Sequence, residues 1–186
     1  MVGPSYGGYS YESVKELEGR YVCLRPGFTS ADVISAYIMD LRWEDAASCL
    51  TFEEKDREDA GHTQRGRVYL PDGRPFMHLV TVGGGGIRLI TVSHPADSQP
   101  GRGLIMTLSN PSGMHFTPAS APIVLKRVTD GIPQLGFLRP GAPDYDSYRE
   151  ELEAVAPAFG FFASAPRAPT AAEARPTEEP RLSLVS

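Results

Sequence analysis

Short apolar runs separated by turn residues make up the middle of the chain, from about residue 19 to residue 128. Runs of this length that are rich in β-branched and aromatic residues predict the strands of an antiparallel sheet. Eight such runs follow one another: RYVCLRP (20–26), VISAYIMDLRW (33–43), SCLTFEE (48–54), RGRVYL (65–70), FMHLVTV (76–82), IRLITVS (87–93), GLIMTLS (103–109) and PIVLKRV (122–128). The pattern therefore predicts a mainly β domain whose eight antiparallel strands form a barrel or a two-layer sandwich.

A helical pattern stands on each side of these runs. In the N-terminal segment, residues 1–18, Ser13 precedes Glu16 at the spacing of a capping box, and Gly19 can end a short helix. After the strands, Pro143 and Asp144 can begin a helix over residues 144–156. Its apolar face would be formed by Tyr145, Tyr148, Leu152 and Val155.

These elements predict one β-rich domain over residues 19–163, which includes the C-terminal helix. The composition changes from residue 164 to residue 186, where Ala and Pro are frequent and no aromatic residue occurs. Such a segment cannot bury enough apolar surface to offset the entropy lost on ordering, so we expect a disordered tail.

Residues 75–95, PFMHLVTVGGGGIRLITVSHP, contain four consecutive glycines between two of the apolar runs. A phosphate-binding loop needs Lys and Ser or Thr directly after its glycines, whereas Ile87 and Arg88 follow here. The glycines are better interpreted as a hairpin loop. In that hairpin His78 would face Thr91, and His94 would lie on the opposite face of the sheet.

Both faces of this hairpin carry apolar residues, and so do both faces of the runs LIMTL and VISAYIM. A sheet that is apolar on two sides must be covered on two sides. One face can form the interior of the barrel or sandwich, and the other needs a helix or a second subunit. Because two short helices are little cover, we predict a homodimer.

Polar residues interrupt the apolar strands at six positions: Arg25, Tyr37, His78, Arg88, Thr91 and Thr107. If one face of the sheet encloses a cavity, these side chains could orient a small-molecule effector, because binding pockets are mostly apolar with a few placed polar groups. Each of them can also be explained as an ordinary residue at a strand end or on the surface.

No catalytic motif accompanies these residues. The sequence has no GxSxG motif, and Ser112 has no base that the pattern can place beside it. The acidic segment FEEKDREDAGH, residues 52–62, lacks the ligand spacing of a calcium loop and predicts a solvated connection. Asp40 lies in an apolar run, where we expect it to pair with Arg42 or another basic group. A small β-barrel isomerase or hydrolase that uses His78 or Asp40 remains an alternative.

A metal site is not expected either. His78 and His94 lie on opposite faces of the predicted hairpin, and His62 and His115 have no ligand-type residue at a suitable spacing. We therefore predict neither a metal nor another cofactor.

Composition narrows the partners and the compartment. The net charge is −5, whereas a protein that binds the phosphate backbone of nucleic acids normally presents a basic face. No apolar run is long enough to span a bilayer, and the N-terminus lacks a signal-peptide pattern, so we expect a cytoplasmic protein without membrane contact. Cys23 and Cys49 both lie in apolar runs and are expected to be buried free thiols.

The ordered motifs LEGRYVCLRPGF, ISAYIMDLRW, LTFEEKDREDAGHTQRGRVYLPDGRPFMHLVT and IRLITVS carry a resemblance over roughly residues 17–130. They resemble the C-terminal, non-DNA-binding region of proteobacterial helix-turn-helix regulators of the XRE type. That resemblance implies a β-rich regulatory domain, which senses an effector or binds another protein. The residues before Leu17 are too few for a helix-turn-helix, so DNA binding is not expected, and the resemblance assigns no functional residue.

Overall fold

The computed structural model describes residues 7–28, 30, 32–59, 61, 63–71, 74–81, 88–109, 116–129 and 131–155. The predicted tail over residues 164–186 and the run of four glycines lie outside the described residues.

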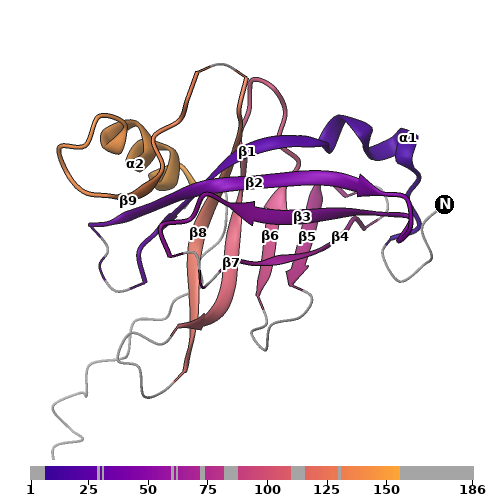
Figure 1. The fold of residues 1–186 in the computed structure, drawn as a ribbon, viewed down its shortest axis with the longest axis horizontal. Coiled ribbons are helices and arrows are strands. Elements are labelled where there is room, and N and C mark those ends of the chain that lie inside the picture. The colour runs from indigo at the N-terminus through magenta and orange to yellow at the C-terminus, as the bar shows by residue number, and fades with distance from the viewer. Residues whose placement is uncertain are drawn as a thin grey trace, which may run out of the picture.

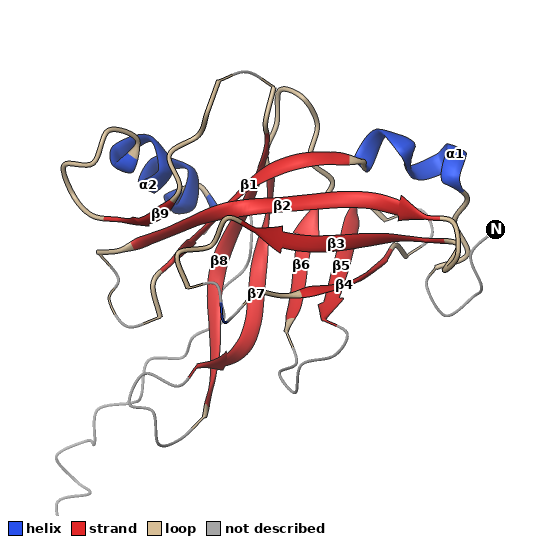
Figure 2. Ribbon diagram, in the orientation of Figure 1, coloured by secondary structure: helices blue, strands red, loops and turns tan. Residues whose placement is uncertain are grey.

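Eight strands form a closed antiparallel barrel in which each strand pairs with the next and β8 pairs back with β1 (Figures 1 and 2). The strands are β1 (Gly19–Pro26), β2 (Ile34–Glu44), β3 (Cys49–Lys55), β4 (Arg65–Tyr69), β5 (Phe76–Thr81), β6 (Leu89–Ser93), β7 (Gly101–Ser109) and β8 (Thr117–Arg127). The mainly β fold and its eight antiparallel strands are confirmed, and of the two predicted architectures the barrel is the one observed.

A ninth strand, β9 (Gly136–Leu138), lies outside the closed barrel and was not predicted. It pairs with the first residues of β2, beyond the stretch of β2 that pairs with β3. β9 therefore continues the line of β3 at one end of the barrel.

The interior of the barrel is filled by every second residue of each strand, as the pleat requires. Leu79 on β5, Ile90 on β6, Ile105 on β7 and Ile123 on β8 are all fully buried there. On β7, Gly103 must lack a side chain, because a Cβ atom there would overlap the carbonyl oxygen of Thr91 on β6. Close packing of side chains thus occupies the middle of the barrel.

The N-terminal segment closes one end of the barrel. It contains α1 (Tyr11–Val14) and the 3-10 helix η2 (Lys15–Leu17), and their Val14 and Leu17 side chains join the interior cluster. The helix begins earlier than the Ser13–Glu16 spacing predicts, because Ser13 lies inside it and its Oγ accepts a hydrogen bond from the Ser10 N–H at 3.1 Å. The predicted short helix is present, but its N-cap is Ser10 and not Ser13.

The hydroxyl of Tyr9 ties this segment to the barrel wall. It donates to the carbonyl oxygen of Val68 on β4 at 2.6 Å and accepts from the N–H of Leu50 on β3 at 3.0 Å. Both bonds are buried. Tyr9→Phe should leave a backbone donor and a backbone acceptor without this partner and lower the free energy of unfolding by about 1–3 kcal/mol in urea denaturation.

Tyr11→Phe is the control for this substitution. Tyr11 is 42 % exposed, so water can replace the hydrogen bond between its hydroxyl and Glu18. Its effect should stay within about 0.5 kcal/mol. Equal effects of the two substitutions would contradict the role given to the Tyr9 hydroxyl.

The predicted hairpin of β5 and β6 is confirmed on both sides of the glycine run. His78 pairs with Thr91, as expected, and the N–H of His94 donates to the carbonyl oxygen of Pro75 at 3.0 Å. The buried face of the hairpin is the one that carries Leu79 and Ile90. His78 and Thr91 therefore point to the outer side of the barrel wall.

The second apolar face of the sheet is covered in part by α2 (Tyr145–Glu153), which is shorter than the predicted helix over 144–156. Its predicted apolar face is confirmed. The four residues of that face pack on the outer side of β1, β2 and β8: Tyr145, Tyr148, Leu152 and Val155. α2 contacts the outer side of β7 near its start, where Arg102 pairs with Glu151 at 2.8 Å. Farther along β7, Met106 is 47 % exposed.

The two cysteines are both buried and free, as predicted. Cys23 points into the barrel from β1, and burial raises the pKa of its thiol to about 12. Cys49 lies at the start of β3 within the same interior cluster. Neither thiol has the low pKa of a reactive cysteine.

Candidate functional site

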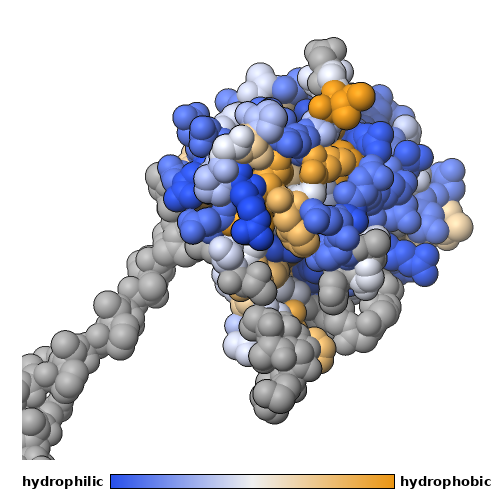
Figure 3. All heavy atoms as spheres, turned by 60° about the vertical axis from the view of Figure 1, so that its left-hand side comes forward, coloured by the Kyte–Doolittle hydropathy of each residue, from blue (hydrophilic) through white to orange (hydrophobic). Residues whose placement is uncertain are grey.

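The barrel has a cavity of about 310 Å³ at the end opposite α1, which we call the mouth. Its lining comes from the end of β1 and the β1–β2 connection, the β3–β4 connection, the residues before β6 and β8, the end of β7, and β9 with the residue that follows it. Figure 3 brings this side of the molecule forward and shows apolar side chains gathered among polar ones. Guanidinium groups and aromatic rings dominate the lining: Arg25, Arg57, Arg88, Arg139, Phe28, Phe116 and Phe137.

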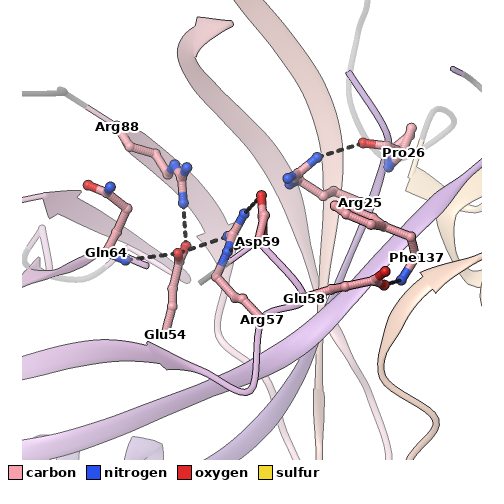
Figure 4. A network of polar contacts seen from close by, with 9 residues as sticks. All are labelled: Arg25, Pro26, Glu54, Arg57, Glu58, Asp59, Gln64, Arg88 and Phe137. Atoms are coloured by element: carbon pink, nitrogen blue, oxygen red, sulfur yellow. Dashed lines mark hydrogen bonds and ion pairs between the residues drawn. The ribbon is translucent and has the colours of Figure 1, made fainter. Parts of the chain in front are cut away.

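A buried carboxylate holds the floor of the mouth together (Figure 4). Glu54 points inward from β3, and its side chain is fully buried. One carboxylate oxygen accepts from Arg57 at 2.9 Å and from the backbone N–H of Gln64 at 3.1 Å, and the other accepts from Arg88 at 2.5 Å. A single carboxylate therefore joins the β3–β4 connection to the residue that precedes β6.

Arg57 binds a second carboxylate as well. Its Nε and Nη2 atoms donate to the two oxygens of Asp59, each at 2.8 Å, in a bidentate pair. Burial alone would lower the pKa of Arg57, but the hydrogen bonds to Asp59 and the charge of Glu54 outweigh it and raise that pKa. Burial would raise the pKa of Asp59, but the bonds and the charge of Arg57 lower it. Arg57, Glu54 and Asp59 are thus a charged and mutually satisfied set.

Arg25 differs from these residues. It is only 4 % exposed, its Nη1 donates to the carbonyl oxygen of Pro26 at 3.0 Å, and its guanidinium carbon lies 4.4 Å from the ring centre of Phe28. Its Nε is buried and has no hydrogen-bond partner among the described residues. Burial lowers the pKa of Arg25, and the charges of Arg57 and Arg88 lower it further against the opposing effect of Tyr37.

Four of the six polar residues singled out from the sequence lie together at the mouth. Arg25, Arg88 and Thr107 line the cavity, and the buried ring of Tyr37 lies beneath Arg57, 4.4 Å from its guanidinium carbon. Strand alternation brings them together. Arg25, Tyr37 and Thr107 occupy inward positions of their strands, and Arg88, directly before β6, also points inward.

The other two, His78 and Thr91, lie outside the barrel wall. The Nδ1 atom of His78 and the Oγ1 atom of Thr91 are 2.8 Å apart, and the His78 ring lies beside that of Tyr69 with 5.8 Å between the ring centres. These contacts join three neighbouring strands, β4, β5 and β6, on the outer surface. Neither residue lines the mouth cavity.

Asp40 also lies on the outer side, where it pairs with Arg42 as the sequence predicts. Its carboxylate is 3.4 Å from Arg42, 2.9 Å from Lys55 and 3.8 Å from Arg20. Three cations therefore surround one carboxylate on the wall formed by β1, β2 and β3. Asp40 does not line the mouth cavity.

Sequence analysis missed the buried carboxylate. The segment FEEKDREDAGH predicts a solvated connection, which is wrong for Glu54 and Arg57, because both side chains are buried and pair with each other. The signal was the alternation Leu50, Phe52, Glu54, which places all three on the inner face of one strand.

The same segment fastens β9 to the mouth. A carboxylate oxygen of Glu58 accepts the backbone N–H of Phe137 at 2.6 Å. Phe137 lines the cavity, so this bond fixes one of the aromatic groups at its rim (Figure 4).

Two further expectations concern metal ions and membranes. Among the described residues, no group of three or more His, Cys, Asp or Glu side chains could hold a metal ion. His62, His115 and Ser112 lie outside the described residues. In the part of the chain that the structure describes, no helix is long and apolar enough to cross a bilayer.

Comparison with known proteins gave no match to a family model, to a curated protein sequence or to a solved structure.

Proposed function

We propose that this chain is a cytoplasmic regulatory module that binds a small organic effector in the mouth of its barrel. The observation that carries the proposal is the mouth cavity itself. It combines aromatic walls with guanidinium groups that a buried hydrogen-bond network holds in place. Binding pockets have this composition, and the cavity at the mouth can hold one small ligand although side chains fill the middle of the barrel. The resemblance to the regulatory region of XRE-type proteins agrees with an effector-sensing role.

Binding without turnover is favoured by the state of the ionisable groups in the cavity. General acid–base catalysis needs a group that exchanges a proton near neutral pH. Here the pKa of Asp59 is lowered by its pair with Arg57, and no histidine is among the described residues that line the cavity. The alternative of an isomerase or hydrolase would rely on His78 or Asp40, both of which lie on the outer wall.

A metabolite library separates the two functions. A sensing module should show a specific rise in melting temperature with one class of molecule, because a ligand at about 100 times its Kd stabilises the folded state by about 2.7 kcal/mol. The same incubations should show no conversion of that molecule. Conversion that is lost in His78→Ala would overturn the proposal in favour of the enzyme.

We also propose that the module forms a homodimer through the outer side of β5, β6 and β7. The partner on this face is then a second copy of the chain and not an unrelated protein. Val80, Leu89 and Met106 lie in register across these strands, and Val80 and Met106 are 38 % and 47 % exposed. The one charged residue in register with this row is Arg67, beside Val80. The centre of the row can therefore be buried against its own copy without burying a charge.

Light scattering at micromolar concentration tests the dimer. The wild-type chain should have twice the monomer mass of 20.2 kDa, and Met106→Glu should return the mass to that of the monomer, because a buried carboxylate would oppose the interface. Ser147→Glu, on the exposed side of α2, adds the same charge away from this face and should remain dimeric. A wild-type monomer at every concentration would contradict the proposal.

A further inference from the structure

The mouth cavity carries more positive than negative charge. Three guanidinium groups, those of Arg25, Arg57 and Arg88, lie at the cavity, whereas the described carboxylates there are those of Glu54 and Asp59. Both carboxylates are bound to Arg57, and Glu54 is shared with Arg88. Arg139 adds a further cation at the exposed rim.

The remaining acidic residues in the connections around the mouth do not pair with Arg25. Asp56 pairs with Arg20 at 3.1 Å, Glu58 accepts the N–H of Phe137, and Asp32 is exposed and does not line the cavity. Residues 29, 31, 60, 62, 82–87 and 110–115, which belong to the same connections but lie outside the described residues, include no Asp or Glu in the sequence. The connections at the mouth thus offer no further carboxylate for Arg25.

Two of the arginines that line the cavity also have a buried hydrogen-bond donor without a partner. The Nε atoms of Arg25 and Arg88 are both buried without a hydrogen-bond partner among the described residues. A buried donor without an acceptor is costly, and a charged one more so. A carboxylate matches the flat fork of a guanidinium, since its two oxygens can accept two parallel N–H bonds.

The rest of the lining suits a flat apolar body. Phe116 is 70 % exposed and Phe137 is 41 % exposed, although both line the cavity, and Phe28 already lies against Arg25. A ring placed among them would bury these aromatic surfaces. The volume of about 310 Å³ lies at the small end of ligand pockets and favours a compact molecule.

We infer that the mouth binds a small aromatic carboxylic acid, with its carboxylate at the Arg25 guanidinium and its ring among Phe28, Phe116 and Phe137. This inference rests on the proposed function and specifies the ligand of the same site. Arg57 is not the recognition group, because Glu54 and Asp59 already occupy its donors. Among the described residues, neither Arg25 nor the exposed Arg139 pairs with a carboxylate, and Arg25 is the one of the two that is buried.

Calorimetry and ligand-observed NMR on the full chain test it with benzoate and 2-naphthoate against the neutral amides benzamide and 2-naphthamide. Each acid should bind at least about tenfold more tightly than its amide. Arg25→Gln should reduce that preference to less than about threefold. Inorganic phosphate, which carries charge without a ring, should not displace either acid.

Two controls keep the result interpretable. Arg42→Gln makes the same change in net charge on the outer wall and should retain the preference for the acids. Without ligand, Arg25→Gln should melt no lower than the wild type, because it removes a buried cation that no described carboxylate binds. A variant that is folded but has lost the preference therefore reports on recognition.

Other outcomes separate this inference from the proposed function. Acids and amides that bind equally, with no effect of Arg25→Gln, would overturn the carboxylate and leave the effector site standing. If neither acid binds at about 10 mM but a molecule of another class from the metabolite library does, the carboxylate is again overturned and the effector site stands. If no molecule of either set binds the folded chain, the inference and the proposed function both fail.

Discussion

Glu54→Gln is expected to lower the free energy of unfolding by about 3–5 kcal/mol. Glu54 is the carboxylate that Arg57 and Arg88 share, and its side chain is fully buried. A glutamine has the same shape but no charge, and its amide NH₂ would face one of the guanidinium groups. The substitution therefore leaves buried positive charge uncompensated, which costs more than the pair itself contributes.

Urea denaturation of the full chain gives this free energy directly. Glu53→Gln is the matched control, since the neighbouring carboxylate points outward, is 53 % exposed and pairs with Lys55 at 3.1 Å. An exposed ion pair contributes little, so the control should change the free energy of unfolding by no more than about 0.5 kcal/mol. A loss below about 1 kcal/mol for Glu54→Gln would mean that water or a bound anion already screens the two arginines.

The strands and the hairpin register could be predicted because both depend on residues that are close together in the sequence. An even number of residues between His78 and Thr91 fixes their pairing, and the runs of apolar residues mark where strands begin and end. β9 has only three residues, GFL, and is shorter than every apolar run from which a strand is predicted. Its pairing with β2 depends on tertiary contacts such as the bond from Phe137 to Glu58, which no local pattern records.

The inward direction of the site residues was harder to predict for a physical reason. On β1 the inward residues Tyr21 and Cys23 alternate with Val22 and Leu24, which α2 covers from outside. When both faces are apolar, alternation does not say which face is the interior, so Arg25 could not be assigned to the cavity from the sequence. On β3 the apolar residues Leu50 and Phe52 mark one face as the inner one. The alternation therefore predicts that Glu54 also points inward.

The same cover on the outer face makes α2 a second source of stability. Leu152 is 7 % exposed and belongs to the outer cluster, which also contains Ile34 of β2 and Val124 of β8. Without the helix these strand residues would face water, and the sheet would expose a large apolar surface. The helix is therefore expected to contribute to the stability of the barrel wall.

Leu152→Ala is accordingly expected to lower the free energy of unfolding by about 2–5 kcal/mol, through lost burial and the cavity left between helix and sheet. Glu150→Ala creates the same residue on the exposed side of the same helix, so it controls for helix propensity and should change stability by no more than about 0.5 kcal/mol. Urea denaturation followed by circular dichroism measures both variants. One cooperative transition with an unchanged slope is expected for Leu152→Ala, because helix and barrel share the outer cluster. A separate early transition of the helix, with the barrel as stable as before, would show that α2 does not support the wall.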